Sequence, residues 1–146
     1  MARGQHMKDR YGGLNGSFSA QLQQFAEATK EALDLTFREV VFLVGRRLVT
    51  MSPVDTGRFR SNWQFSTGAP AGGEIAEIEG AGETLGRLLL AVGDLSAGEV
   101  AYIVNNLPYA VPLEYGHSTQ APAGMVRVTI ADFQNIVDRV IEARKV

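Results

Sequence analysis

The stretch that decides the fold is residues 17–53, SFSAQLQQFAEATKEALDLTFREVVFLVGRRLVTMSP. Its apolar and small residues recur at alternating steps of three and four, which is the spacing of one face of an α-helix. Ser17 can accept free amide hydrogen bonds at the start, and Pro53 disfavours helical geometry at Ser52. The stretch therefore predicts an amphipathic helix over residues 18–52. The positions on its apolar face are Leu22, Phe25, Thr29, Ala32, Leu33, Thr36, Val40, Leu43, Val44 and Leu48.

This predicted helix is longer than a compact domain is wide. At about 1.5 Å per residue it spans roughly 50 Å, which exceeds the width expected of a domain of 146 residues. Part of the helix must therefore project from the domain or meet another subunit. We expect Leu33, Val40 and Val44 to be buried, partly against a neighbouring subunit.

Two short strands and a short helix are expected next. Alternation of apolar and polar residues predicts a half-buried strand over residues 59–66, with Trp63 in the core. Residues 67–82 are rich in glycine and predict a loop, and the leucines of residues 85–92 mark one face of a short helix. Residues 100–104 are continuously apolar, which is typical of a buried central strand.

The last third of the chain predicts an irregular segment and a closing helix. Pro108 and Pro112 remove amide donors, so residues 109–116 are expected to be irregular. A helix is expected from near Pro122, with a buried face made of Val126, Ile130, Phe133, Val137, Val140 and Ile141. The whole order predicts an α+β fold, in which a long N-terminal amphipathic helix and a C-terminal helix pack on a small β-sheet. This single domain covers residues 17–146, after a glycine-rich, flexible arm over residues 1–16.

Composition excludes several classes of protein. Hydrophobic residues make up 45% of the chain and charged residues 21%, so a wholly disordered or fibrous chain is excluded. The absence of cysteine excludes disulfides, cysteine zinc sites and a thiol nucleophile, and it fits a reducing cytoplasm. A net charge of −2 argues against a dedicated nucleic-acid binder. No apolar run approaches the roughly 18 residues of a membrane span.

Candidate catalytic groups are few. His117 has Ser118, Glu114 and Asp55 as conceivable partners for hydrolysis, but the G-x-S-x-G elbow of many hydrolases is missing. The other histidine, His6, belongs to the arm, so a site with several histidines for a metal is not expected. We therefore expect no catalysis, no metal and no cofactor, and we keep a small hydrolase as an alternative.

A basic cluster is the clearest candidate for binding. Four arginines flank the turn after the long helix, and they could face a phosphate backbone. They could equally be a solvated helix end, where cations offset the negative end of the helix dipole. These residues are Arg46, Arg47, Arg58 and Arg60.

Two motifs are more specific than these clusters. The first is Ser52-Pro53-Val54-Asp55-Thr56-Gly57 after the long helix, and the second is Tyr109-Ala110 followed by Leu113-Glu114-Tyr115-Gly116 before the closing helix. Together they resemble the tail-completion, or neck, proteins of long-tailed bacteriophages, the group of minor tail protein Z. In that group a Pro-Val-Asp-Thr-Gly turn after the first helix recurs, as does a Tyr-Ala followed by Glu-Tyr-Gly or Glu-Phe-Gly. The resemblance covers about residues 17–145.

The resemblance implies a structural virion protein without catalysis. Such a subunit forms a homo-oligomeric ring, a hexamer, at the junction of head and tail, and it assembles in the host cytoplasm. Its partners would be a head connector or head-closure protein, and tail terminator or tail tube proteins, with genomic DNA passing through the channel independently of its sequence. At least two of the four arginines would line or approach this channel. The alternatives are a tail terminator that caps the tail tube and a free DNA-binding module that uses the arginines.

Specific roles are expected for the motif residues. Asp55 or Thr56 would cap the next segment, and Gly57 would supply a positive φ. Glu114 and Tyr115 would orient the adjoining loop. Tyr109 and Gly116 complete the set of structural turn residues.

Overall fold

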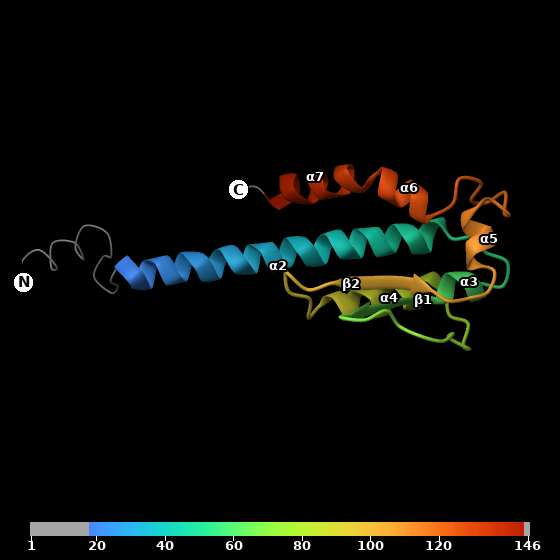
Figure 1. Ribbon diagram of the computed structural model, residues 1–146, viewed down its shortest axis with the longest axis horizontal. Helices are drawn as coiled ribbons and strands as arrows, with labels where there is room; N and C mark the ends of the chain where they lie inside the picture. The colour runs from blue at the N-terminus through green and yellow to red at the C-terminus, as the bar shows by residue number, and fades with distance from the viewer. Residues whose placement is uncertain (1–17, 145–146) are drawn as a thin grey trace, which may run out of the picture.

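The computed structural model describes residues 18–144, which form helices and a two-stranded sheet that lies on one side of the long helix (Figure 1). This arrangement confirms the predicted α+β class. The arm predicted for residues 1–16 and the cap predicted at Ser17 lie outside the described residues. In chain order the elements are α2 (Phe18–Met51), α3 (Arg58–Ser61), β1 (Trp63–Thr67), α4 (Ala81–Val92), β2 (Ala101–Asn105), α5 (Ala110–Glu114), α6 (Val126–Ala131) and α7 (Phe133–Arg144).

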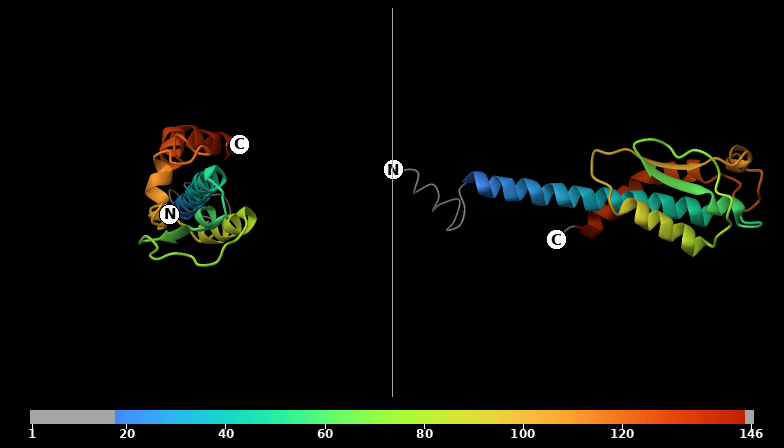
Figure 2. Two further views of the ribbon diagram at one scale, coloured as in Figure 1. Left: turned by 90° about the vertical axis from the view of Figure 1, so that its right-hand side faces the viewer. Right: turned by 90° about the horizontal axis from the view of Figure 1, so that it is seen from below.

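Helix α2 is the central element, and the other elements lie around its C-terminal half. Helices α6 and α7 run along one side of α2, while the sheet and α4 lie on the other side (Figures 1 and 2). The N-terminal part of α2 extends beyond the rest of the fold, as its predicted length required. The helix ends at Met51, two residues before Pro53, and confirms the predicted boundary to within a residue.

A glycine allows α4 to approach α2 closely. Gly45 is buried in α2, and a Cβ atom at this position would lie 2.6 Å from Cδ2 of Leu88. Leu88 itself is fully buried in α4, where it forms a cluster with Val92 and Leu95. Phe37 and Val41 of α2 pack against this cluster. The absence of a side chain at Gly45 therefore sets the spacing of the two helices.

The main core lies where the sheet meets the end of α2. Strands β1 and β2 are antiparallel, with Trp63 opposite Asn105 and Thr67 opposite Ala101. Trp63 is 4% exposed, which confirms its predicted place in the core. The buried residues of this cluster are Leu48, Val49, Phe59, Trp63, Leu107, Ala121 and Met125.

The strand predicted over residues 59–66 is wrong in its first part. The amide of Ser61 donates to the carbonyl of Gly57 at 3.0 Å, so this segment is the short helix α3 and the strand begins at Trp63. Phe59 and Trp63 are four residues apart, and their rings pack edge to face with centroids 5.8 Å apart. The apolar spacing of this segment is helical at its start and alternating only afterwards.

The prediction of a buried central strand over residues 100–104 is also wrong. Strand β2 pairs only with β1 among the described residues, and each of its five side chains is half-buried. Val100 precedes the strand and is 57% exposed. A run of apolar residues is equally compatible with a strand at the edge of a small sheet, because its length does not report how many neighbours it has.

The segment over residues 109–116 was expected to be irregular, but it contains the short helix α5. Pro112 is the third residue of this helix. The amides of a first helical turn have no partner within the helix, so proline is tolerated there. The prediction is wrong because it takes Pro108 and Pro112 to disrupt a helix at any position, including its first turn.

The closing helix differs from its prediction in start, continuity and buried face. It begins at Val126 rather than near Pro122, and it is divided into α6 and α7 at Asp132. This break shifts the phase of the helical face, so the predicted face is not buried as a whole. Thr129, Ile136 and Val140 are buried. The predicted face instead includes exposed residues, namely Val126 at 37%, Ile130 at 67%, Phe133 at 46% and Ile141 at 46%.

The contact of α2 with α4 gives the first prediction. Gly45→Val should lower the free energy of unfolding by about 1–3 kcal/mol, because the new side chain must displace the buried Leu88. Gly86→Val in α4 is the matched control, since a Cβ there meets nothing within 4 Å. Urea unfolding of both variants measures the difference. Equal effects of the two substitutions would contradict the proposed role of Gly45.

Candidate functional site

The first motif begins with a buried hydrogen bond to the core tryptophan. The hydroxyl of Ser52 donates to the carbonyl of Leu48 at 2.7 Å and accepts from Nε1 of Trp63 at 2.7 Å. An indole N–H that is buried without an acceptor costs free energy, and Ser52 supplies the acceptor at the end of α2. The motif therefore joins the end of the long helix to the sheet.

The rest of this motif starts helix α3. Thr56 Oγ1 accepts from the amide of Arg58 at 3.2 Å, which bears out the capping role expected of Thr56. Gly57 has a φ of 92°, as expected, and it is buried. Asp55 is exposed, and its carboxylate has no hydrogen-bond partner in the part of the chain that the structure describes, so it does not share the capping role.

Glu114 is the centre of the second motif. Its carboxylate accepts from the amides of Met125 at 2.8 Å, Val126 at 2.9 Å and Arg127 at 2.9 Å. These amides belong to the start of α6, where no carbonyl within the helix is available to them. Nε of Arg127 also donates to the carboxylate at 3.2 Å, and its guanidinium lies 4.7 Å from the ring centroid of Tyr115. Glu114 thus orients the loop before α6, as expected.

These contacts lower the pKa of Glu114. Burial by itself would raise that pKa, but the hydrogen bonds from the three amides and from Arg127 outweigh it, and the pKa lies below its ordinary value of 4.5. The ionised carboxylate is therefore favoured by the folded state.

Two glycines permit close backbone approaches in the loop that follows Glu114. Gly116 has a φ of 88°, and a Cβ there would lie 2.7 Å from the carbonyl oxygen of Pro122. Gly124 has a φ of 85°, and a Cβ there would clash with the backbone and the carboxylate of Glu114. Any other residue at either position would be strained. Sequence reasoning missed Gly124, because its only signal is that it lies shortly before a helix.

One side-chain amide joins the first motif to the loop that follows the second motif. The amide of Val54 donates to Oε1 of Gln120 at 2.9 Å, and Nε2 of Gln120 donates to the carbonyl of Val54 at 3.1 Å. Tyr109 lies beside the same turn, with its ring centroid 6.2 Å from that of Phe59. The motifs are therefore one structural unit at the end of the fold. Gln120 was missed, because nothing in its local sequence marks a residue whose partner is 66 positions away.

The candidate catalytic residue His117 lies on this loop. Its side chain is exposed, and its backbone amide donates to the carbonyl of Pro112 at 3.2 Å. Ser118 Oγ accepts from the amide of Gln120 at 3.1 Å, so the hydroxyl is used in the local turn. No group of three or more metal-ligating side chains is present among residues 18–144.

The four arginines do not share one environment. Arg46 is exposed on α2, while Arg47 forms an ion pair with Asp132 at the junction of α6 and α7. Arg58 pairs with Glu74 at 3.2 Å. Arg60 is half-buried, and its Nε is buried without a hydrogen-bond partner in the described part of the chain. Arg47 therefore has a structural role, and Arg46 and Arg58 are the more accessible cations.

The three residues expected at a subunit interface also differ. Val40 is buried at 9% exposure and Val44 is half-buried within the chain. Leu33 is 55% exposed, so no element among residues 18–144 buries it, and its expected burial against a neighbouring subunit stays a prediction. The reason is that the elements around α2 cover only its C-terminal half (Figure 1).

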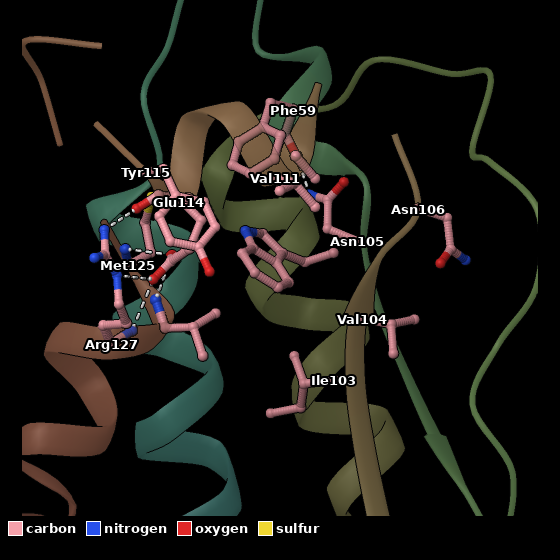
Figure 3. A pocket seen from close by; sticks show the side chains of 13 residues that line it. Phe59, Ile103, Val104, Asn105, Asn106, Val111, Glu114, Tyr115, Met125 and Arg127 are labelled. Atoms are coloured by element: carbon pink, nitrogen blue, oxygen red, sulfur yellow. Dashed lines mark hydrogen bonds and ion pairs between the residues drawn. The ribbon is translucent and has the colours of Figure 1, made fainter. Parts of the chain in front are cut away.

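An apolar groove lies beside the second motif. Its volume is about 570 Å³, and it lies between β2 on one side and α5 with the start of α6 on the other (Figure 3). Trp63 is among its lining residues. Val111 and Tyr115 at its rim are 65% and 66% exposed. Glu114 and Arg127 are the charged side chains of its lining, and they pair with each other. The groove therefore offers an electrically neutral, apolar surface.

Comparisons of this chain with protein families, with curated proteins and with solved structures gave no match. None of the helices in residues 18–144 combines the length and the apolar character that crossing a membrane requires. The site must therefore be interpreted from its own geometry.

The contacts of Glu114 give the second prediction. Because its pKa is lower in the folded state, the carboxylate stabilises the fold above the unfolded pKa, and this contribution is lost as the pH falls through the folded-state pKa. Glu114→Gln should lower the free energy of unfolding by about 1–3 kcal/mol at neutral pH. The difference from the wild type should shrink below about pH 4, measured by urea unfolding across pH.

The exposed Glu77 provides the matched control for this substitution. Glu77→Gln should change stability little at any pH, because surface substitutions away from specific contacts have small effects. A loss for Glu114→Gln that is the same at neutral and acid pH would contradict the role of the ionised carboxylate.

Proposed function

We propose that this chain is a structural virion protein that completes the tail of a tailed bacteriophage and joins it to the DNA-filled head. It forms a homo-oligomeric ring, a hexamer, between a head connector or head-closure protein and the tail terminator or tail tube. The observation that carries the proposal is the joining of the two motifs of the resemblance into one unit. Val54 of the first motif and the loop after the second are hydrogen-bonded through Gln120.

The chemistry of this unit supports a structural role. The side-chain oxygen atoms of Ser52, Thr56 and Glu114 accept hydrogen bonds from backbone amides or from the core tryptophan. Ser118, the conceivable nucleophile, is similarly engaged in its own turn. A nucleophile needs a base within hydrogen-bond reach, oriented by a third group. The described contacts of Ser118 and His117 are backbone contacts of a turn, which favours the structural reading over the hydrolase.

The exposed apolar side chains support assembly. Large apolar patches on a soluble chain mark interaction surfaces. Here they occur on the projecting half of α2, at the rim of the groove and on α6, where Phe25 is 71% exposed, Val111 65% and Ile130 67%. A subunit of a ring must cover such surfaces with its neighbours or with adjacent rings.

Phage particles assembled without the gene for this protein test the proposed function. Their phenotype also distinguishes a tail-completion protein from a tail terminator. Without a completion protein, filled heads and tails of normal length should accumulate unjoined, as seen by electron microscopy. A terminator caps a growing tube, so its loss should instead give tails of uncontrolled length. Normal joined particles would contradict both functions.

Complementation with variants adds a control for catalysis. His117→Ala should restore joined, infectious particles, because the proposed function makes no use of the imidazole. Loss of infectivity by a folded His117→Ala protein, together with hydrolysis of a generic ester or phosphodiester by the wild type, would favour the hydrolase.

The accessible arginines give a prediction about DNA. A neck ring lets DNA pass, so contacts to phosphates should be weak and independent of base sequence. Arg46→Glu should allow the ring to assemble but should reduce the fraction of particles that retain DNA. Arg139→Glu on α7 is the matched control, since Arg139 is also exposed and was not placed in the channel. Arg58→Glu should act like Arg46→Glu, because its exposed ion pair contributes little to stability.

Equal DNA retention in the Arg46→Glu and Arg139→Glu particles would contradict a channel position for Arg46. The free DNA-binding module would instead bind DNA as an isolated chain, and titration of the purified protein with duplex DNA at low salt measures this directly.

A further inference from the structure

The projecting half of α2 carries an apolar stripe. Leu22 and Phe25 are 52% and 71% exposed, and Leu33 is 55% exposed. These positions and Thr29 fall on one face of the helix at steps of three and four. Asp34, whose carboxylate accepts from the amide of Ala97 at 2.7 Å, marks where the rest of the fold reaches α2. The stripe lies N-terminal to that point.

A helical segment of this length needs a covering surface. Most helical stability in proteins comes from packing an apolar face, and the side chains of Leu22, Phe25 and Leu33 are each more than half exposed in the isolated subunit. Glu27, Lys30 and Glu31 are placed by their spacing outside the stripe. The exposed apolar stripe of α2 therefore contains no charged residue.

The groove between β2 and α6 has matching properties. It is concave and apolar, and its two charged lining residues, Glu114 and Arg127, neutralise each other. Val111 and Tyr115 stand exposed at its rim, and Val126 leads from it to the exposed Ile130. A charged occupant would lose its hydration there without gaining a partner, whereas an uncharged helical stripe would not.

The two surfaces of one chain lie at opposite ends of the fold. The groove is beside α5 and the start of α6, while the projecting half of α2 extends away from them (Figure 1). A straight helix cannot fold back onto a groove at the other end of its own domain. One copy can, however, supply the stripe and the next copy the groove. Such a contact joins two different surfaces, so repetition closes into a ring when the rotation permits.

We infer that residues 18–33 of α2 dock through Leu22, Phe25 and Leu33 into the groove of a second copy of this chain, bounded by β2, α5 and α6. This inference rests on the proposed ring and names its subunit contact. The occupant is a helix of the same chain, so the interface needs neither a cofactor nor an additional protein.

Cross-linking of the purified full chain tests the contact. The sequence has no cysteine, so two introduced thiols can be assigned without ambiguity. Thr29→Cys lies on the stripe and nearly preserves the side-chain volume, and Val111→Cys lies at the rim of the groove. The two single variants, made with tags of different size, are mixed and treated with a short bismaleimide. Gln24→Cys, which points away from the stripe, replaces Thr29→Cys as the control.

The expected product joins residue 29 of one copy to residue 111 of another, and the Gln24→Cys control should give far less of it. A product joining 29 to 29 would mean that the helices pack on each other, and one joining 111 to 111 would mean a two-fold contact between grooves. Either of these as the main product overturns the inference, as does a chain that remains monomeric and uncross-linked at every concentration.

A second variant tests the energetic role of the stripe. Phe25→Glu should weaken self-association at least about 30-fold, since it places a charge in a desolvated apolar contact. The thermal unfolding of the monomer should change little, because Phe25 is exposed in the isolated subunit. Gln24→Glu is the matched control and should assemble as the wild type does. Analytical ultracentrifugation measures the association constants.

Unchanged association of the Phe25→Glu variant would overturn the inference. Hydrogen exchange that protects the amides of β2 on assembly, without protecting residues 22–33, would also overturn it in favour of strand addition at the edge of the sheet. These outcomes are independent of the particle phenotype, so the subunit contact and the proposed function can fail separately.

Discussion

The packing of the fold depends on how closely α4 can approach α2. Gly45 has no side chain, and Leu88 fills the space that a side chain would need. That contact positions α4 beside the sheet, where Arg87 donates to the carbonyls of Ser61 at 2.8 Å and Trp63 at 3.1 Å. The same helix therefore supports both the second apolar cluster and the start of β1. A larger residue at position 45 would displace all of these contacts together.

The opposite side of α2 is held by polar contacts. Arg47 pairs with Asp132 at the break between α6 and α7, and Arg144 pairs with Glu39 at 2.6 Å. The hydrogen bonds of Asp132 with Asn135 and Arg47 lower the pKa of its carboxyl group. Ionic contacts of partly exposed groups add little stability but fix orientation. They hold the C-terminal helices along α2, while Ile130 and Phe133 stay exposed.

Hydrogen bonds within the two motif regions fix the geometry of one end of the molecule. Glu114 accepts from three successive amides, Gly124 permits the chain to pass within contact distance of it, and Gly116 permits a close approach to Pro122. Loops usually vary in conformation more than helices and strands do. Here the loop before α6 is fixed by a carboxylate and by Gln120, so the rim of the groove is preorganised. A preorganised surface loses less entropy when it binds.

The roles of the candidate site residues could be predicted from the sequence to different extents. Thr56, Gly57 and Glu114 act as expected, because turn chemistry depends on residue type and on neighbours within a few positions. The basic cluster was less predictable. Arg47 and Arg58 have partners 85 and 16 residues away, and local spacing carries no information about such pairs.

By itself, the sequence determined the long helix, its end before Pro53, the core position of Trp63 and the α+β class, since each follows from periodicity or from restricted backbone geometry. Tertiary structure alone decided that β2 is an edge strand, that the closing helix breaks at Asp132 and that Leu33 stays exposed. The apolar character of a residue indicates only that its burial is favourable. Which surfaces are available to bury it depends on the packing of elements distant in sequence, and Leu33 lies beyond the reach of those in its own chain.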